Sequence, residues 1–482
     1  MSLFLFKNYR SEELNVEKEV STRVKLSIAA VGLLSFISIL VETSMNVTFP
    51  TLTKDLSVSL GTVQWLTTGY LLLTTIIMST TAYVLKKFAP LKIFSFAVIF
   101  CFIGSITCLV APSFPVLLTG RLLQAISAGL SIPLMFNLIF VEVPSSKIGL
   151  YTGFASIIVS LAPALGPTYG GVVSGLWSWR AIFAGIAPLI VIVAILGWFT
   201  IRGTARGVEG INFDYFSVAG LAIIFSMILF TFDQAGSHGW FSSQFLIWSI
   251  ITVVIFGIFA WYNSKTDRQL IDFSILKNHL LRLRLFSYFG LQFINIGLSF
   301  LLPIFAQTVL KLDTSHAGIM LLPGSLLGAA VGPIAGSIYD KKGATIPMMI
   351  SGVLVTLGAG MFFIFSDHLS FVAIILLYSL LRIGFNFGFG TSLSDGSIQV
   401  QGSKKSDQNS LFSMMQQYAG SLGTNVLSVV ISAVSITSNT KNNVINTLTG
   451  AKLDFALLTL LASLILISVI YAAVKYPQKS LD

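Results

Sequence analysis

Long apolar runs separated by short polar breaks dominate the chain. A window of about 19 residues, suited to the search for membrane-spanning helices, finds apolar runs near 25–48, 60–85, 91–111, 114–140, 148–174, 180–200, 215–233, 243–263, 284–309, 315–338, 345–365, 369–394, 407–436 and 453–475. Each run is long enough to cross a hydrocarbon core of ~30 Å as an α-helix. The pattern therefore predicts about fourteen transmembrane helices and an all-α integral membrane protein.

The Lys and Arg residues give the orientation of these spans. They gather in the polar segments on the side of the N-terminus, whereas the segments on the opposite side hold only Lys54, Lys311, Lys441 and Lys452. Short cytoplasmic loops carry such an excess of Lys and Arg. We therefore expect both termini in the cytoplasm and a multi-pass protein of the plasma membrane.

Composition supports the same class of protein. Hydrophobic residues make up 55% of the chain and charged residues only 10%, against about a quarter charged in soluble proteins. The net charge of +10 lies in the short segments between apolar runs, so the expected partner is the lipid bilayer and not nucleic acid. The four His are scattered near loops and no phosphate-binding loop is present, so we expect no metal site, no cofactor and no catalytic residues.

The fifth span contains a Gly- and Pro-rich stretch at 161–171. Prolines and glycines remove backbone donors and side chains, which lets a membrane helix bend and pack closely against a neighbour. An ordinary small-residue packing face is the alternative interpretation. Two prolines together with a Gly-Gly pair favour a conformational role for Pro163, Gly166, Pro167, Gly170 and Gly171.

Ionisable residues inside spans are the next candidates. Glu42 is the one carboxylate that we place well inside a span, and burial disfavours its charged form, so it can gain and lose a proton. Arg121, in the fourth span, costs at least ~2.5–3.5 kcal/mol at mid-membrane and should face a polar interior. The alternatives are a structural, hydrogen-bonded Glu42 and an Arg121 that snorkels to the outer surface. Arg180 and Arg382 also remain within spans.

A polar loop follows two spans at corresponding places. One copy, 336–343, reads Gly-Ser-Ile-Tyr-Asp-Lys-Lys-Gly, and the other, 85–89, has Lys86 at the position of Asp340 and Ala89 at that of Gly343. Such repetition suggests two halves, a common plan in secondary transporters. The longest polar connection, 262–285, separates them.

These motifs resemble the major facilitator superfamily, specifically its fourteen-span drug/proton antiporter branch. The stretch 161–171 is similar to the antiporter signature called motif C, 121–125 to motif B, the residues around Glu42 to the first-helix motif, and 336–343 to motif A. The resemblance implies two six-helix bundles, 25–200 and 284–476, two linker transmembrane helices within 201–283, and cytoplasmic tails at 1–24 and 477–482. It also implies a cytoplasmic gate at Gly336, Asp340, Lys341 and Gly343, whereas the N-terminal copy departs from the motif at Lys86 and Ala89.

A substrate cavity needs polar groups that face the interior of the bundles. Besides Glu42, the candidates are polar or aromatic residues within spans: Asn46, Gln64, Trp65, Asn295 and Asn386. Abundant Phe and Met could complete a broad, adaptable pocket.

The expected function is a proton-coupled antiporter that exports amphipathic drugs or toxic small molecules by alternating access. Glu42 and Arg121 would couple transport to protons, and the proton gradient would replace a cofactor. One proton crossing ~150 mV supplies about 3.5 kcal/mol, enough for a several-hundred-fold gradient of a neutral substrate. We expect monocationic or neutral substrates and a monomer. An exporter of a native metabolite or lipid, a polytopic membrane transferase and a channel are the alternatives.

Overall fold

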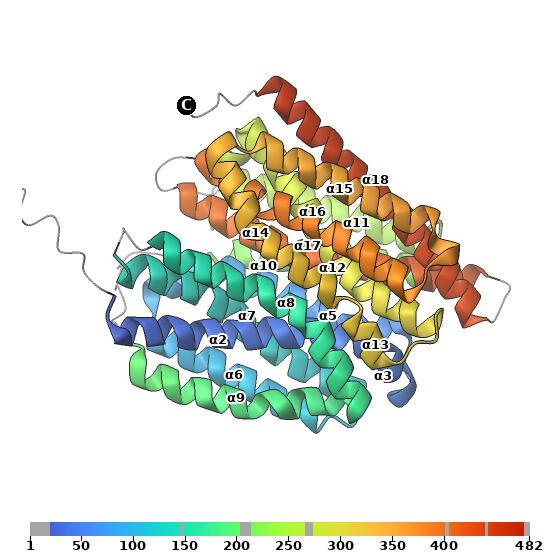
Figure 1. Ribbon diagram of the computed structural model, residues 1–482, viewed down its shortest axis with the longest axis horizontal. Coiled ribbons are helices and arrows are strands. Elements are labelled where there is room, and N and C mark those ends of the chain that lie inside the picture. The colour runs from blue at the N-terminus through green and yellow to red at the C-terminus, as the bar shows by residue number, and fades with distance from the viewer. Residues whose placement is uncertain are drawn as a thin grey trace, which may run out of the picture.

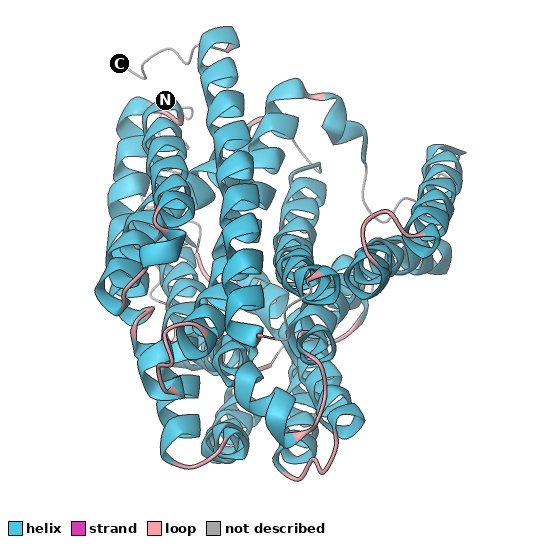
Figure 2. Cartoon of the chain, turned by 90° about the vertical axis from the view of Figure 1, so that its right-hand side faces the viewer, coloured by secondary structure: helices cyan, strands magenta, loops and turns pink. Residues whose placement is uncertain are grey.

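The computed structural model describes residues 20–144, 148–202, 214–265, 273–400, 404–438 and 442–476. Within these ranges the chain consists of helices and connecting loops, with no strand (Figure 2). The predicted tails lie mostly outside the described residues, since 1–19 and 477–482 are not among them.

The N-terminal group of helices begins with a span built from three consecutive segments, α2 (Thr22–Ser44), the 3-10 helix η1 (Met45–Thr48) and α3 (Phe49–Asp55). The helices that follow are α4 (Leu60–Val63), α5 (Trp65–Lys87), α6 (Pro90–Leu109), α7 (Phe114–Glu142), α8 (Ile148–Leu176) and α9 (Trp179–Thr200). We call α2 to α9 the N-bundle.

Two linker helices and a second group complete the chain. The linkers are α10 (Tyr215–His238) and α11 (Ser243–Lys265). After η3 (Phe273–Lys277), the second group contains α12 (His279–Thr308), α13 (Thr314–Ile319), α14 (Leu322–Lys342), α15 (Thr345–Ile364), η4 (Ser366–His368), α16 (Phe371–Ile398), α17 (Lys404–Thr437) and α18 (Asn443–Lys475). We call α12 to α18 the C-bundle.

The two bundles lie side by side with their long helices roughly along one direction (Figure 1). The start of α2 and the end of α18 lie at the same end of the molecule, which we call the proximal end. The opposite end, where α3 and α13 lie, is the distal end.

The helices account for the predicted spans. Thirteen helical stretches of the described residues are long and apolar enough to cross a membrane, and α8, with 29 residues, supplies the remaining predicted span. The largest error in the prediction is the last span, which was expected to start at 453 but begins at Asn443. Polar residues at 443–454 lower the local hydropathy, yet Asn442 caps the helix by accepting a hydrogen bond from Val444 N at 3.0 Å.

Candidate functional site

Glu42 occupies the last turn of α2, inside the N-bundle. Its side chain is only 4% exposed. Among the described residues its carboxylate forms no hydrogen bond and no ion pair, although it interacts electrostatically with Arg121. Glu42 is therefore not the hydrogen-bonded structural acid that was considered as an alternative.

Arg121 extends from α7 into the same region and is fully buried. Its guanidinium donates hydrogen bonds to Gln124 Oε1 at 3.0 Å, Leu66 O at 3.3 Å, and Val41 O and Glu42 O at 3.4 Å each. All of these acceptors lie inside the N-bundle, so the interpretation that Arg121 snorkels to the outer surface is wrong. Glu42 and Arg121 lie at similar depth, because Arg121 donates a hydrogen bond to the backbone oxygen of Glu42.

Helix α5 completes this N-bundle cluster. Asn46, one turn beyond Glu42, accepts a hydrogen bond from Thr67 Oγ1 at 2.8 Å, while its amide nitrogen is buried without a partner. The Tyr70 ring lies 4.4 Å from the Arg121 guanidinium carbon, and the Tyr70 hydroxyl donates to Ser38 O at 3.1 Å. The cluster thus joins α2, α5 and α7 around one acid and one base.

The glycines of α8 let this helix approach α2 directly behind Glu42. A Cβ on Gly166 would lie 2.9 Å from Leu40 O, and a Cβ on Gly170 would collide with Ser44 O. A Cβ on Gly171 would instead lie 2.7 Å from Thr314 O of α13 in the C-bundle. Helix α8 therefore packs closely against both bundles, with Pro163 and Pro167 inside it.

The hydrogen bonds between the two bundles, among the described residues, lie in the distal half of the molecule. Thr68 and Thr424 share a hydrogen bond of 2.9 Å, Ser421 Oγ donates to Thr68 O at 2.9 Å, and Gln307 Nε2 donates to Val47 O at 2.7 Å. Within the described ranges we find no hydrogen bond between the bundles in the proximal half. The bundles are therefore closed together at their distal side.

Gln64 and Trp65 belong to this distal seam and not to the cluster around Glu42. Gln64 accepts a hydrogen bond from Thr68 at 3.2 Å, and its amide nitrogen is buried without a partner. The Trp65 indole hydrogen-bonds the Asp233 carboxylate of the linker helix α10.

A second cluster lies in the C-bundle, between α12 and α16. Arg382 donates a hydrogen bond to Asn295 Oδ1, and the Asn295 amide donates to Gln292 Oε1 at 3.3 Å. Asn386, one turn along α16, donates to Arg382 O at 3.0 Å. The predicted substrate residues thus fall into three places: the N-bundle cluster, the distal seam and this C-bundle cluster.

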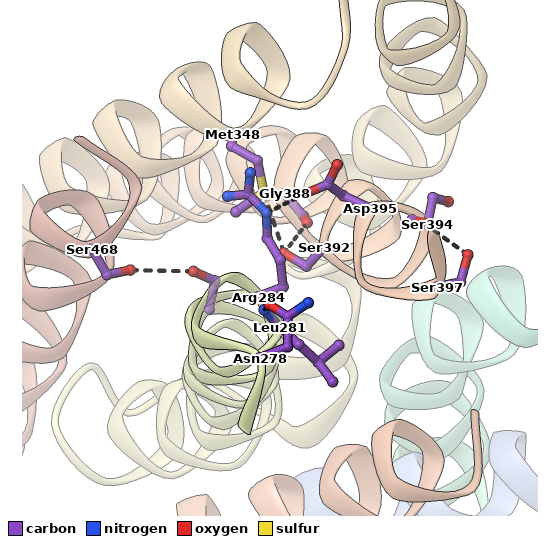
Figure 3. A network of polar contacts seen from close by, with 11 residues as sticks. Asn278, Leu281, Arg284, Met348, Gly388, Ser392, Ser394, Asp395, Ser397 and Ser468 are labelled. Carbon is purple, nitrogen blue, oxygen red and sulfur yellow. Dashed lines mark hydrogen bonds and ion pairs between the residues drawn. The ribbon is translucent and has the colours of Figure 1, made fainter. Parts of the chain in front are cut away.

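At the proximal end a buried ion pair ties α12 to α16. Arg284 Nε lies 2.5 Å from Asp395 Oδ2, and the two side chains are 5% and 0% exposed. Ser392 and Met348 lie beside the pair (Figure 3), with Ser392 Oγ 3.2 Å from the Met348 sulfur. We had placed Arg284 at the edge of a span and Asp395 just past one, so the sequence pattern did not indicate that the two residues meet.

The predicted gate residues lie close to this ion pair in space, since Tyr339 interacts electrostatically with Asp395, Asp340 and Arg284, but they lie on an exposed helix end. Asp340 and Lys341 are exposed, and neither forms a hydrogen bond or ion pair among the described residues. Gly343 ends α14 with φ +74°, a conformation that favours glycine. A Cβ on Gly336 would contact nothing within 4 Å.

The statement that Glu42 is the one carboxylate well inside a span is wrong. Asp454 lies beyond the first two turns of α18, is fully buried, and has no partner for either carboxylate oxygen among the described residues. Asp395 also belongs to a long helix, α16. Because the last span was predicted to start at 453, Asp454 was placed at the edge of that span and its burial was not predicted. Asn442, a residue type that commonly caps helix N-termini, could have indicated the earlier start of the helix.

Comparisons with known proteins agree with this architecture. The model of the Major Facilitator Superfamily matches residues 31–424. The chain is 30% identical over 408 residues to the lincomycin resistance protein LmrB of Listeria innocua, covering 84% of this chain and 86% of that one. It is 24% identical over 421 residues to the riboflavin transporter RibZ of Clostridioides difficile, with 87% and 90% covered.

A solved structure shares the fold at low sequence identity. The crystal structure of a bacterial homolog to the human lysosomal transporter Spinster, in an inward-facing and unoccupied conformation, matches with a TM-score of 0.64 and 14% identity, covering 94% of this chain and 98% of that one. The superfamily consists of membrane transporters for small molecules and not of enzymes. Because the family model matches more than half of its length, and its helical spans and fold agree with that match, the chain belongs to the Major Facilitator Superfamily.

Proposed function

We propose that this transporter is a proton-coupled antiporter that exports amphipathic drugs or toxic small molecules from the cell. The similarity to a protein named for lincomycin resistance supports the drug-export part of the proposal. The Glu42–Arg121 cluster supports the coupling to protons. The proton gradient supplies the energy, and no cofactor takes part.

The burial of Glu42 without a hydrogen bond or ion pair is the observation that best supports the coupling of transport to protons. A charged carboxylate without a hydrogen bond or ion pair is costly in a membrane interior, so protonation relieves that cost. Arg121 is held in place by four acceptors and lies close enough to favour the charged form when the proton leaves. Glu42 can therefore alternate between a protonated and a charged state without losing its surroundings.

The close packing of α8 connects this acid to the movement of the bundles. Gly166 and Gly170 back the end of α2, and Gly171 of the same helix packs on α13. A change at the end of α2 is thus transmitted through α8 to the distal seam between the bundles. Opening that seam and closing the proximal side, where the gate residues Asp340 and Lys341 lie, would give the second state of alternating access.

The test is efflux from proteoliposomes under an imposed pH gradient. Wild-type protein should drive uphill movement of a fluorescent amphipathic cation, and a folded Glu42→Gln variant should bind the same dye without uphill transport. Full uphill transport by Glu42→Gln would remove Glu42 from the mechanism.

Export of a native metabolite is a second candidate, because a relative at 24% identity is named as a riboflavin transporter. Loading the same proteoliposomes with riboflavin would separate the two. Proton-driven movement of riboflavin without movement of any amphipathic drug would favour the metabolite.

The proposal also includes the membrane in which the protein lies and its orientation there. The bias of Lys and Arg supports a plasma-membrane protein with both termini, and therefore the proximal end, in the cytoplasm. We propose that it acts as a monomer.

A further inference from the structure

Arg382 is a buried cation whose charge is not balanced by any acid among the described residues. It is 5% exposed on α16. Its single described hydrogen bond goes to the neutral amide of Asn295, its Nε is buried without a partner, and its guanidinium carbon lies 5.2 Å from the ring centroid of Phe385.

This arrangement is unusual because Arg stays charged in proteins and is costly inside a membrane. Arg121, also fully buried, offsets that cost with four acceptors. Arg382 has one acceptor, so most of its donor capacity is unused in this state.

Arg382 borders a small cavity. Arg382 and Asn295 line it together with Tyr378, Phe385 and aliphatic residues of α12, α15 and α16. The guanidinium is a planar fork that matches a carboxylate through two parallel hydrogen bonds. An apolar wall beside one fixed cation suits an amphipathic molecule that carries an acidic group.

On the side that lines the cavity, α16 is tightly packed toward the proximal end, where a Cβ on Gly384 or Gly388 would collide with Val355 or Ser351 of α15. Gly328 of α14 packs against Arg382 and Asn386, with a Cβ there 3.0 Å from Arg382 O. One and two turns further toward the proximal end, a Cβ on Gly332, Gly336 or Gly390 would contact nothing within 4 Å. These open positions lie on α14 and at Gly390, and not on the side of α16 that lines the cavity.

We propose that Arg382, oriented by Asn295, binds a carboxylate of the transported molecule, so that the transporter accepts zwitterionic and anionic amphipathic compounds besides the cationic and neutral ones expected from Glu42. This inference rests on the proposed export of small molecules. It assigns the C-bundle to the acidic group of the substrate, while the N-bundle carries the proton.

The test uses a rhodamine with a free carboxyl group and the methyl ester of the same dye. Purified full-length protein in lipid nanodiscs, in chloride-free buffer, is titrated with each dye. Arg382→Gln should weaken binding of the free acid by about 10- to 100-fold, the range expected for a lost charged hydrogen-bond pair, and leave binding of the ester within about 2-fold. Arg382→Lys should recover part of the affinity for the acid, since it restores the charge without the fork.

Arg180→Gln is the matched control, because it also removes an arginine from a helix but one that donates to Ala111 O at 2.8 Å and stacks on Trp179. It should leave the binding of both dyes unchanged. Equal loss of both dyes in Arg382→Gln, or no binding of the free acid to wild-type protein, would overturn the proposal. If chloride stabilises the wild type against heat, but not Arg382→Gln, and displaces the acid, the site holds an inorganic anion and the proposal is wrong.

Failure of this inference is separable from failure of drug export. The preference for the free acid over the ester, measured in nanodiscs, needs no gradient and depends on Arg382 and not on Glu42. Uphill transport of the ester in proteoliposomes depends on Glu42 and should persist in Arg382→Gln.

Discussion

The N-bundle and the C-bundle place an arginine of their fourth long helix beside their first helix, but they surround it with different chemistry. In the N-bundle, Arg121 of α7 meets α2 next to the acid Glu42; in the C-bundle, Arg382 of α16 meets α12 at the amide Asn295. Glu42 lies eight residues before Pro50, and Asn295 lies eight residues before Pro303. The two clusters therefore occupy matching positions of the two halves.

The difference lies in what each position can exchange. A carboxyl group can take up and release a proton, whereas an amide cannot. Arg121 is saturated by internal acceptors and acts as a fixed neighbour of Glu42, while Arg382 keeps donors available for a ligand. The comparison teaches that matching positions of a duplicated framework can differ in chemistry, and on our proposals the N-bundle carries the proton while the C-bundle recognises the charge of the substrate.

The largest effect should come from removing the acid. With Glu42→Gln the driving force of one proton is lost, so a substrate gradient that can reach several-hundred-fold at ~150 mV should fall to equilibrium. The measurement is steady-state dye distribution in proteoliposomes. Asn295→Gln, an amide replacement at the matching position, should keep the gradient; its collapse there would break the comparison.

The packing behind the N-bundle cluster gives the next effect. Gly170→Ala places a methyl group against Ser44 O, and overpacking of this kind costs about 1–3 kcal/mol. We expect about a 10-fold lower initial rate of efflux. Gly332→Ala, where the added methyl group contacts nothing, is the control, and equal rates in the two variants would show that the approach of α8 to α2 is not needed.

Stability should distinguish the two arginines. Arg121→Met leaves several buried acceptors without their donor, which should lower the free energy of unfolding by about 2–4 kcal/mol. Arg382→Met removes one hydrogen bond and an unbalanced charge, so its change should stay within about 1 kcal/mol. Thermal unfolding in the same detergent measures both, and a larger loss for Arg382→Met would reverse the comparison.

The smallest effect is expected at Asp454, the acid that is buried without a partner in α18. A buried carboxyl group without a partner has a lower free energy in its neutral form. The neutral amide in Asp454→Asn has a similar size. Uphill transport should stay within about 2-fold of wild type, as expected if only Glu42 couples. Loss of proton-driven efflux in Asp454→Asn, measured in the same liposomes, would place a second proton site in the C-bundle.

Much of the fold follows from hydropathy, because each span must be apolar over about 20 residues. The helices match the predicted spans closely except α18, whose polar first turns are stabilised by capping and tertiary packing. Glu42 and Arg121 were identifiable because ionisable residues in a membrane are rare.

The rest of the site depends on contacts between distant segments. The pairing of Arg284 with Asp395 joins residues 111 positions apart, and nothing in either local pattern indicates it. The separation of Gln64 and Trp65 from Glu42 also could not be predicted, because it depends on how the helices pack against one another. The sequence shows which polar residues lie inside spans, but their grouping required the three-dimensional arrangement.

Proton release on substrate binding tests the central claim most directly. Purified protein in weakly buffered detergent solution, mixed with a saturating amphipathic cation, should release about one proton per substrate bound, as required if Glu42 exchanges its proton for the substrate. Asp454→Asn should release the same amount, and Glu42→Gln should bind the cation and release none. Undiminished proton release from Glu42→Gln would contradict the account.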